Sequence, residues 1–246
     1  MLFEANNLSK SFGALMAVND ISLSVQEGEV LAVIGPNGAG KTTLFNLIAG
    51  VFIPDTGIIR FRDQDVTRMG PDTLCHLGMA RSFQITNIFQ GLTVHENIRL
   101  ASQGQEKKLR LFGSVAKQRR PIEEAERIMD LMGLSAHWNS LAGNLSHGEQ
   151  RYLEIGIALA SRPQLLLLDE PTAGMSPAET QVTVELIKGI RKHVTIILIE
   201  HDMGLVFEVA DRLLVMNQGS MLTEGLPADV RADRRVQEAY FGSEED

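Results

Sequence analysis

The sequence predicts an α/β fold with a mainly parallel sheet flanked by helices. Strand-like runs alternate with longer helical patterns along the chain, the arrangement that builds a parallel sheet covered by helices. The central strand candidates are also short and almost wholly apolar, as expected for strands buried on both faces. They are residues 30–34, 165–168, 195–199 and 213–216.

Two further segments indicate antiparallel hairpins beside the main sheet. Residues 58–62 form a strand-like run directly after Gly57, and the pair Gln218 and Gly219 separates two strand-like runs near the C-terminus. Glycine-containing pairs between such runs are typical of tight hairpin turns. We therefore expect a peripheral antiparallel β subdomain.

The strand pattern disappears between about residues 82 and 163. Pro121 opens a segment whose apolar residues recur at helical spacing: Ile122, Ala125, Ile128, Met129 and Met132. We therefore expect a single domain over residues 1–246, in which residues 1–84 and 164–246 form the core with its antiparallel part. Residues 85–163 would form an inserted helical subdomain.

A helix is also expected from Ser176 toward His193. Its first residues combine an N-cap serine, Pro177 at the first helical position and Glu179 as the capping glutamate. The residue types therefore predict where this helix begins.

Composition and charge narrow the class of protein. The 246 residues carry 23 Lys and Arg against 31 Asp and Glu, and this net charge of −8 argues against wide contact with nucleic acid. The single cysteine, Cys75, cannot form an internal disulfide, which favours a reducing, cytoplasmic location. No stretch approaches 18 consecutive apolar residues, so we expect no membrane crossing by this chain. The basic segment 106–120 is interpreted as a solvated loop, with contact to lipid headgroups or a partner as the alternative.

A phosphate-binding motif lies between a strand and a helix. Residues 35–42, GPNGAGKT, match G-x-x-x-x-G-K-[ST] directly after strand 30–34 and before the helical segment 43–50. The loop backbone and the helix N-terminus favour phosphate, Lys41 would reach the β and γ phosphates, and the Thr42 hydroxyl is a ligand type for Mg²⁺. The expected nucleotide-binding residues are Gly35, Pro36, Asn37, Gly38, Ala39, Gly40, Lys41, Thr42 and Thr43.

Two acids follow the second apolar strand. In P-loop ATPases the second protein contact to Mg²⁺ comes from an Asp at the end of a neighbouring strand, which is the position of Asp169. Glu170 lies one residue further, where a carboxylate could polarise the attacking water. The pair and the phosphate loop together indicate a P-loop NTPase that hydrolyses ATP or GTP.

Residues 145–150, LSHGEQ, resemble the signature motif of ATP-binding-cassette (ABC) ATPases. Phe12, Gln84 and His201 match further family positions in the family's order, so the resemblance covers essentially the whole chain. It implies a RecA-like ATPase with ATP and Mg²⁺ as ligands. It also implies that two copies pair head to tail, with each ATP held between the phosphate loop of one copy and the signature motif of the other.

The resemblance implies roles for these matched residues. Phe12 would stack on adenine, although a buried phenylalanine is the alternative. Gln84 would contact the metal and sense the γ-phosphate while linking to a transmembrane partner, and His201 would hydrogen-bond the γ-phosphate. Ser146 and Gly148 would contact the nucleotide bound to the other copy. Ser146 with Glu149 also fits a capping box, and both interpretations can hold together.

Two positions depart from the family pattern. His147 replaces the glycine that is common at the third signature position, and Ser176 stands where many relatives have an aspartate. The resemblance therefore says less about subunit closure and communication at these two positions.

Several sequence segments are more specifically similar to the ATPase subunits of branched-chain amino acid importers. They are residues 80–84, 91–97, 199–203, 215–219 and 239–242. This similarity implies two integral-membrane permeases, a second cassette ATPase that is identical or paralogous, and an external substrate-binding protein. It also implies a peripheral position on the cytoplasmic face of the membrane. Importers of urea or short amides, and the lipopolysaccharide-export ATPase, are alternatives within this group.

Two other classes compete with a transport ATPase. A soluble ABC ATPase acting on nucleic acid or ribosomes usually carries two cassettes or a long coiled coil, whereas this chain has one phosphate loop and no sustained heptads. A P-loop nucleotide kinase would have no use for residues 145–150 or His201. The sequence therefore favours transport.

Overall fold

The computed structural model describes residues 1–82, 88–104 and 119–241. A six-stranded sheet forms its centre, in the order β10-β9-β3-β8-β7-β6. All neighbouring strands run parallel except the edge strand β10, which pairs antiparallel with β9. The strands are β3 (Val30–Ile34), β6 (Met79–Arg81), β7 (Leu165–Asp169), β8 (Thr195–Ile199), β9 (Arg212–Asn217) and β10 (Ser220–Gly225).

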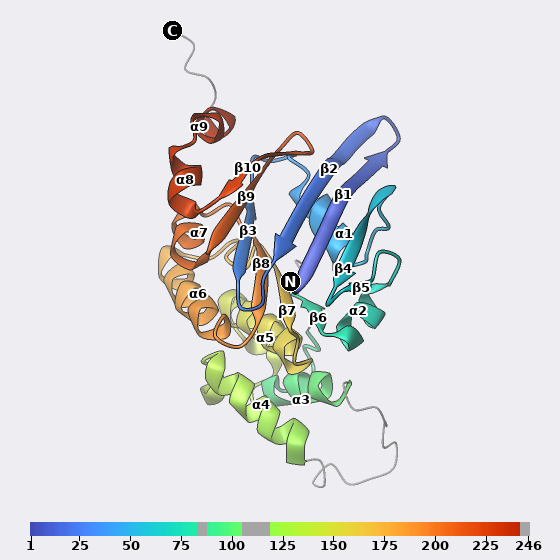
Figure 1. The fold of residues 1–246 in the computed structure, drawn as a ribbon. Helices are drawn as coiled ribbons and strands as arrows, with labels where there is room; N and C mark the ends of the chain where they lie inside the picture. Colours follow the sequence, from blue (N-terminus) through green and yellow to red (C-terminus); the bar gives the residue numbers. More distant parts are fainter. Residues whose placement is uncertain (83–87, 105–118, 242–246) are drawn as a thin grey trace.

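A second sheet of four antiparallel strands lies beside the first (Figure 1). Its order is β2-β1-β4-β5, and the strands are β1 (Phe3–Phe12), β2 (Leu15–Val25), β4 (Thr56–Phe61) and β5 (Gln64–Asp65). The prediction of a mainly parallel sheet with a peripheral antiparallel part is confirmed.

The helices cover the faces of the main sheet. In order they are α1 (Lys41–Ile48), α2 (Pro71–Leu77), α3 (Val94–Gly104), α4 (Arg119–Leu131), α5 (His147–Ala160), α6 (Pro177–Ile190), α7 (Met203–Val209), α8 (Pro227–Ala232) and α9 (Arg234–Phe241). Two 3₁₀ turns, η2 (Ser135–His137) and η3 (Ala142–Asn144), lie between α4 and α5. Helices α3 and α4 lie together at one end of the molecule, away from the antiparallel sheet (Figure 1).

Two apolar clusters fill the space on opposite faces of the parallel strands. Alternate residues of β3 divide between them, with Val30, Ala32 and Ile34 in one and Leu31 and Val33 in the other. The first cluster packs under helices α3 to α9, and the second packs under α1 and the antiparallel sheet. Since α1 carries the phosphate motif, this packing fixes the motif between two sheets.

Three helix boundaries differ from the expected ones. Helix α1 begins at Lys41 inside the motif, because Gly40 in a left-handed conformation serves as its N-cap. The described part of helix α4 already includes Arg119, two residues before Pro121. Helix α6 ends at Ile190, and the chain turns before His193. Most of the basic segment 106–120 lies outside the described residues.

Candidate nucleotide site

The phosphate loop connects β3 to α1, and its backbone conformation requires glycine at two positions. Gly35 has φ +152° and Gly40 has φ +97°, values that side chains rarely allow. A Cβ on Gly35 would lie 2.2 Å from the Met216 carbonyl oxygen, and one on Gly40 would lie 2.2 Å from the Ala17 carbonyl oxygen. The loop therefore packs directly on the backbones of β9 and β2, which leaves no room for side chains there.

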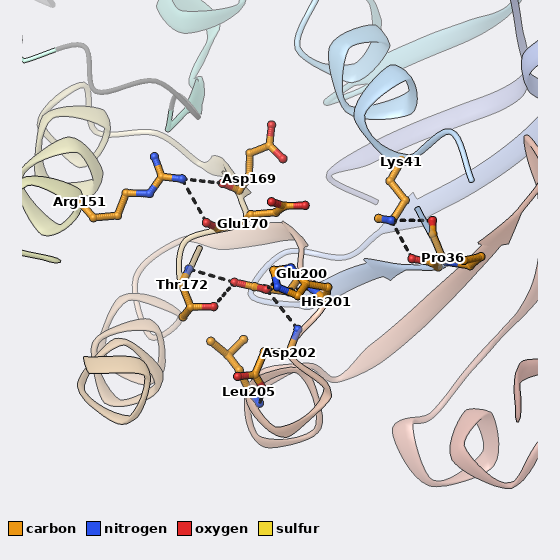
Figure 2. Close-up of polar contacts among 11 residues, drawn as sticks. Pro36, Lys41, Arg151, Asp169, Glu170, Thr172, Glu200, His201, Asp202 and Leu205 are labelled. Atoms are coloured by element: carbon orange, nitrogen blue, oxygen red, sulfur yellow. Dashed lines mark hydrogen bonds and ion pairs between the residues drawn. The ribbon is translucent and has the colours of Figure 1, made fainter. Parts of the chain in front are cut away.

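The Lys41 side chain is buried at the first turn of α1 and folds back over this loop. Its Nζ donates hydrogen bonds to the carbonyl oxygens of Gly35, at 2.7 Å, and Pro36, at 3.0 Å (Figure 2). Burial lowers the pKa of Lys41 from its usual value, and the negative charge of Glu170 acts in the opposite direction. A buried cation thus faces a carboxylate at the mouth of the phosphate loop.

A pocket of about 490 Å³ opens over the loop. It is lined by Leu15, Met16, Ala17, Asn37, Gly38, Ala39, Gly40, Lys41, Thr42, Thr43, Glu170, Gln218 and Gly219. The β9–β10 turn is held there because the Gly219 N–H donates to the Ala39 carbonyl oxygen at 3.0 Å. Sequence reasoning missed the lining contributed by β2 and by residues 218–219. The Gln218–Gly219 signal indicated only a hairpin turn.

Asp169 ends β7 and is almost completely buried, with 1% exposure. Its Oδ2 accepts a hydrogen bond from Arg81 Nη2 at 2.7 Å, whereas Oδ1 has no hydrogen-bond partner within the described part of the chain. A buried carboxylate oxygen without a partner is costly, and a hard cation such as Mg²⁺ would satisfy it. Asp169 therefore fits the expected metal ligand.

Arg81 was not among the expected site residues, although it lies in the segment 80–84. Its Nη1 donates to Asn46 Oδ1 on α1 at 2.6 Å, and its guanidinium carbon lies 5.1 Å from the centroid of the Phe45 ring. One arginine thus joins the helix of the phosphate loop to the carboxylate of Asp169. Because the guanidinium is planar and rigid, its two hydrogen bonds fix the positions of these two acceptors relative to each other.

We predict that Arg81→Gln lowers the affinity of the protein for Mg²⁺ by about tenfold. The reason is that loss of a charge-assisted hydrogen bond costs on the order of 1.5 kcal/mol. Titration of Mn²⁺ by electron paramagnetic resonance, with ADP bound, measures this affinity. Nucleotide binding in the presence of EDTA should stay within about twofold. Arg191→Gln breaks an ion pair with Asp211, the residue before β9, and is the matched control. An unchanged metal affinity in Arg81→Gln would refute this role.

Glu170 follows Asp169 in a left-handed backbone conformation, with φ 45°. Its N–H donates to the Ile199 carbonyl oxygen at 2.9 Å. Its own carbonyl oxygen accepts from Arg151 Nη2 at 3.1 Å (Figure 2). Arg151 is buried and also donates to the carbonyl oxygen of Asp169 at 3.2 Å. An uncommon conformation held from both sides places the Glu170 side chain in the pocket wall, close to Lys41.

His201 lies two residues after the end of β8, and its imidazole is 62% exposed. Its Nδ1 lies 3.5 Å from Oε2 of Glu200, a residue with no exposed surface. The structure thus places His201 after the strand next to β7, at the same edge of the sheet as Glu170. It does not line the pocket over the phosphate loop.

The signature segment lies apart from this pocket. Ser146 is the N-cap of α5, and its capping box with Glu149 is confirmed. Ser146 and His147 are exposed, and a Cβ on Gly148 would lie 2.9 Å from Oε1 of Glu179. Ser176 with Glu179 forms the second expected capping box. Two capped helix N-termini, those of α5 and α6, therefore lie against each other on the surface.

Phe12 ends β1, and the residue is 44% exposed. It packs edge-on against Phe52, with the ring centroids 5.4 Å apart. Leu15 and Met16 on β2 reach the pocket lining, whereas Phe12 does not. Gln84 lies outside the described residues.

The phosphate loop and the two acids are all found at the carboxyl edge of one parallel sheet, the usual place for ligands in such sheets. This arrangement defines a nucleotide-binding protein of the P-loop class. In the described residues no helix is both long enough and apolar enough to cross a membrane.

Comparison with known proteins identifies the family. Residues 18–173 match the ABC transporter family, and residues 220–246 match the family described as branched-chain amino acid ATP-binding cassette transporter. The chain is 40% identical to the high-affinity branched-chain amino acid transport ATP-binding protein LivG of Salmonella typhimurium, over 98% of each chain. It is 37% identical to the corresponding protein BraF of Pseudomonas aeruginosa, again over 98% of each.

Solved structures agree with this result. A cassette of an ABC transporter crystallised in its ADP conformation is 32% identical, with a TM-score of 0.87 over 98% of this chain and 99% of that one. The chain belongs to the ABC transporter family, in the branched-chain amino acid group of ATP-binding cassettes. The fold and the family expected from the sequence are confirmed.

Proposed function

We propose that this chain is the ATP-hydrolysing subunit of an importer for branched-chain or other hydrophobic amino acids. The observation that carries the hydrolytic part is that Glu170 lines the same pocket as the phosphate loop. The transported class rests on the full-length similarity to branched-chain transport proteins. The chain would act on the cytoplasmic face of the membrane as a peripheral subunit.

The phosphate groups of ATP would lie over residues 35–43. Lys41, now bonded to loop carbonyls, would turn its ammonium to the β and γ phosphates, and Glu170 would stay opposite it. Thr42, Asp169 and Gln84 would hold Mg²⁺, which supplies positive charge against the phosphate oxygens when bound. Leu15 and Met16 would contact the adenosine side of the pocket, with Phe12 stacking at its outer end.

Hydrolysis needs a base and a γ-phosphate contact on the same side. Glu170 would take the proton of the attacking water, and its fixed backbone would keep the carboxylate aimed at the pocket. His201 would donate a hydrogen bond to the γ-phosphate, assisted by Gln84. The exposure of His201 leaves its imidazole able to reach such a group.

A second copy or a paralogue would complete the site. Ser146 and Gly148 lie at the capped N-terminus of α5, a position that favours phosphate, yet they do not line this chain's own pocket. Head-to-tail pairing would bring them onto the other copy's ATP. ATP then favours the closed pair, because its phosphate contacts to the second copy exist only there, and hydrolysis removes them.

Permease docking is supported by an apolar pocket of about 390 Å³ between α2, α3 and α5. Its wall includes Val51, Leu74, Ala101 and Ile157, and it also contains Arg81 of β6, the strand that leads toward Gln84. An amphipathic helix from a membrane subunit fits such a groove. Movement of a helix docked in this pocket would be transmitted to the metal ligand Asp169 through Arg81.

The external substrate-binding protein would act on the permeases, and nucleic acid would play no part.

We expect a tagged copy of this chain to co-purify from solubilised membranes of its host with two permeases and a second cassette ATPase. Deletion of its gene should abolish uptake of radiolabelled leucine by the host. The wild-type gene should restore that uptake, whereas a gene carrying Lys41→Ala should not. If the deletion abolishes uptake of urea or acetamide and leaves leucine uptake normal, the chain belongs to an importer of urea or short amides instead. Recovery of ribosomal or DNA-repair proteins without membrane subunits would overturn the transport function.

A further inference from the structure

A buried carboxylate that the mechanism above does not use lies beside the nucleotide site. Glu200 is the residue between β8 and His201, and it has no exposed surface. A buried carboxyl group of this kind is retained only where several partners satisfy its oxygens. Its partners come from two loops that follow different strands.

Each carboxylate oxygen of Glu200 serves one loop (Figure 2). Oε1 accepts from the backbone N–H of Thr172 at 3.0 Å and from the Thr172 hydroxyl. Oε2 accepts from the N–H groups of His201, at 2.9 Å, and Asp202, at 3.3 Å. The side chain therefore ties the loop after β7 to the loop after β8.

Each loop lies next to a residue of the proposed hydrolytic site, Glu170 on one and His201 on the other. Thr172 lies two residues after Glu170 and opens the turn that leads to Ser176, where α6 is capped. On the other loop, Asp202 caps α7 by accepting from the Leu205 N–H at 3.1 Å. A displacement of either loop therefore changes the hydrogen bonds of the other through a single carboxylate.

We propose that Glu200 is a positioning residue that couples His201 to the segment between Glu170 and Ser176. A γ-phosphate contact at His201 would then fix the base and the surface segment next to the signature helix at the same time. The inference rests on the proposed function for the role of His201. The coupling itself is a property of the chain without nucleotide.

Glutamine cannot replace this carboxylate. Three of the four partners are backbone N–H donors, so the amide nitrogen of glutamine would face at least one of them wherever it is placed. A buried N–H group would lose its acceptor, which is more costly than simple loss of a bond. Glu200→Gln thus disturbs the link with almost no change in volume.

The test is hydrogen exchange at the amides of Thr172, His201 and Asp202, in the full chain without nucleotide. We expect Thr172→Val, which removes only the hydroxyl bond at one end of the link, to speed exchange at His201 and Asp202 by threefold or more. Glu200→Gln should speed exchange at both loops by tenfold or more. Ser102→Ala is the matched control, because it also removes one buried hydroxyl, which donates to the Ile98 carbonyl oxygen within α3. Unchanged exchange at His201 and Asp202 in Thr172→Val would overturn the coupling.

A second measurement separates this inference from the proposed function. In a Glu170→Gln background, ATP-driven pairing is followed by light scattering after gel filtration, with ATP affinity of the single chain measured in parallel. Adding Glu200→Gln should raise the ATP concentration needed for pairing by tenfold or more, with single-chain affinity within twofold. Adding Glu124→Gln, another buried carboxylate with arginine partners, should have no effect. Absence of pairing in the Glu170→Gln parent would contradict pairing of identical copies and leave a paralogue as the partner, while the exchange result would still decide the coupling.

Discussion

Replacement of Glu170 by glutamine is expected to lower ATP hydrolysis by about 10²- to 10⁴-fold, the range for loss of a general base. ATP binding should stay within about twofold, because glutamine keeps the size of the side chain and the loop contacts belong to the backbone. Arg151 and Ile199 hold that backbone through main-chain atoms. The substitution should therefore leave the left-handed turn in place and remove only the base.

A kinetic assay of phosphate release and a filter-binding assay with labelled ATP measure the two quantities separately. An ATP-bound pair should accumulate in the variant, since the contacts that close the pair are no longer removed by hydrolysis. Glu185→Gln is the control, because Glu185 is an exposed acid on α6 that pairs only with Lys188 among the described residues. Turnover at the wild-type rate in Glu170→Gln would show that another group is the base.

The four central strands could be predicted because each is an apolar run buried on both faces. Val30–Ile34 and Thr195–Ile199 match the predicted bounds, and the other two extend by one residue at one or both ends. Strand β7 gains Asp169 itself, because a buried carboxylate with an arginine partner can continue a ladder that an apolar pattern ends. Burial on both faces is thus the feature that a single sequence reveals best.

Strands β1, β2 and β6 could not be predicted from the same pattern. Strands β1 and β2 carry Asn, Ser, Asp and Lys among their apolar residues, and their register shifts at three points, which breaks a simple alternation. Strand β6 is only three residues long. Their pairing depends on partners far along the chain, which no local pattern contains.

The residues of the site divide in the same way, into those with a local sequence pattern and those whose contacts are far along the chain. The phosphate loop and the two acids were found because their chemistry depends on residues that are close in sequence. Arg81, Arg151 and Glu200 were missed as site residues because each contacts a group 18 to 88 positions away in the sequence. A lone arginine or glutamate beside an apolar strand carries no signal of this kind until the topology places it.

Replacement of Lys41 is expected to affect binding rather than turnover alone. Loss of a charge-assisted contact to phosphate costs about 2–3 kcal/mol, so Lys41→Ala should weaken ATP binding by about 30- to 150-fold. Lys41→Met, which keeps most of the side-chain volume, should weaken it similarly. Calorimetric titration with ATP measures the change, and Lys188→Ala on the exposed face of α6 is the control. Normal affinity in both Lys41 variants would contradict the phosphate-loop role.

Without nucleotide, replacement of Lys41 is not expected to lower the thermal stability of the chain. Burial lowers the pKa of Lys41 below its unfolded value, so the charged form is less favourable in the folded chain. This destabilisation is present at neutral pH. It disappears as the pH rises through the unfolded pKa near 10.5. The thermal midpoint of Lys41→Met without nucleotide at pH 7 should therefore equal or exceed that of the wild type. The same added concentration of ATP should raise the midpoint of the wild type by more than that of the variant, because stabilisation by a ligand follows its affinity. A midpoint several degrees lower in Lys41→Met would show that the bonds to Gly35 and Pro36 outweigh the cost of burying the charge.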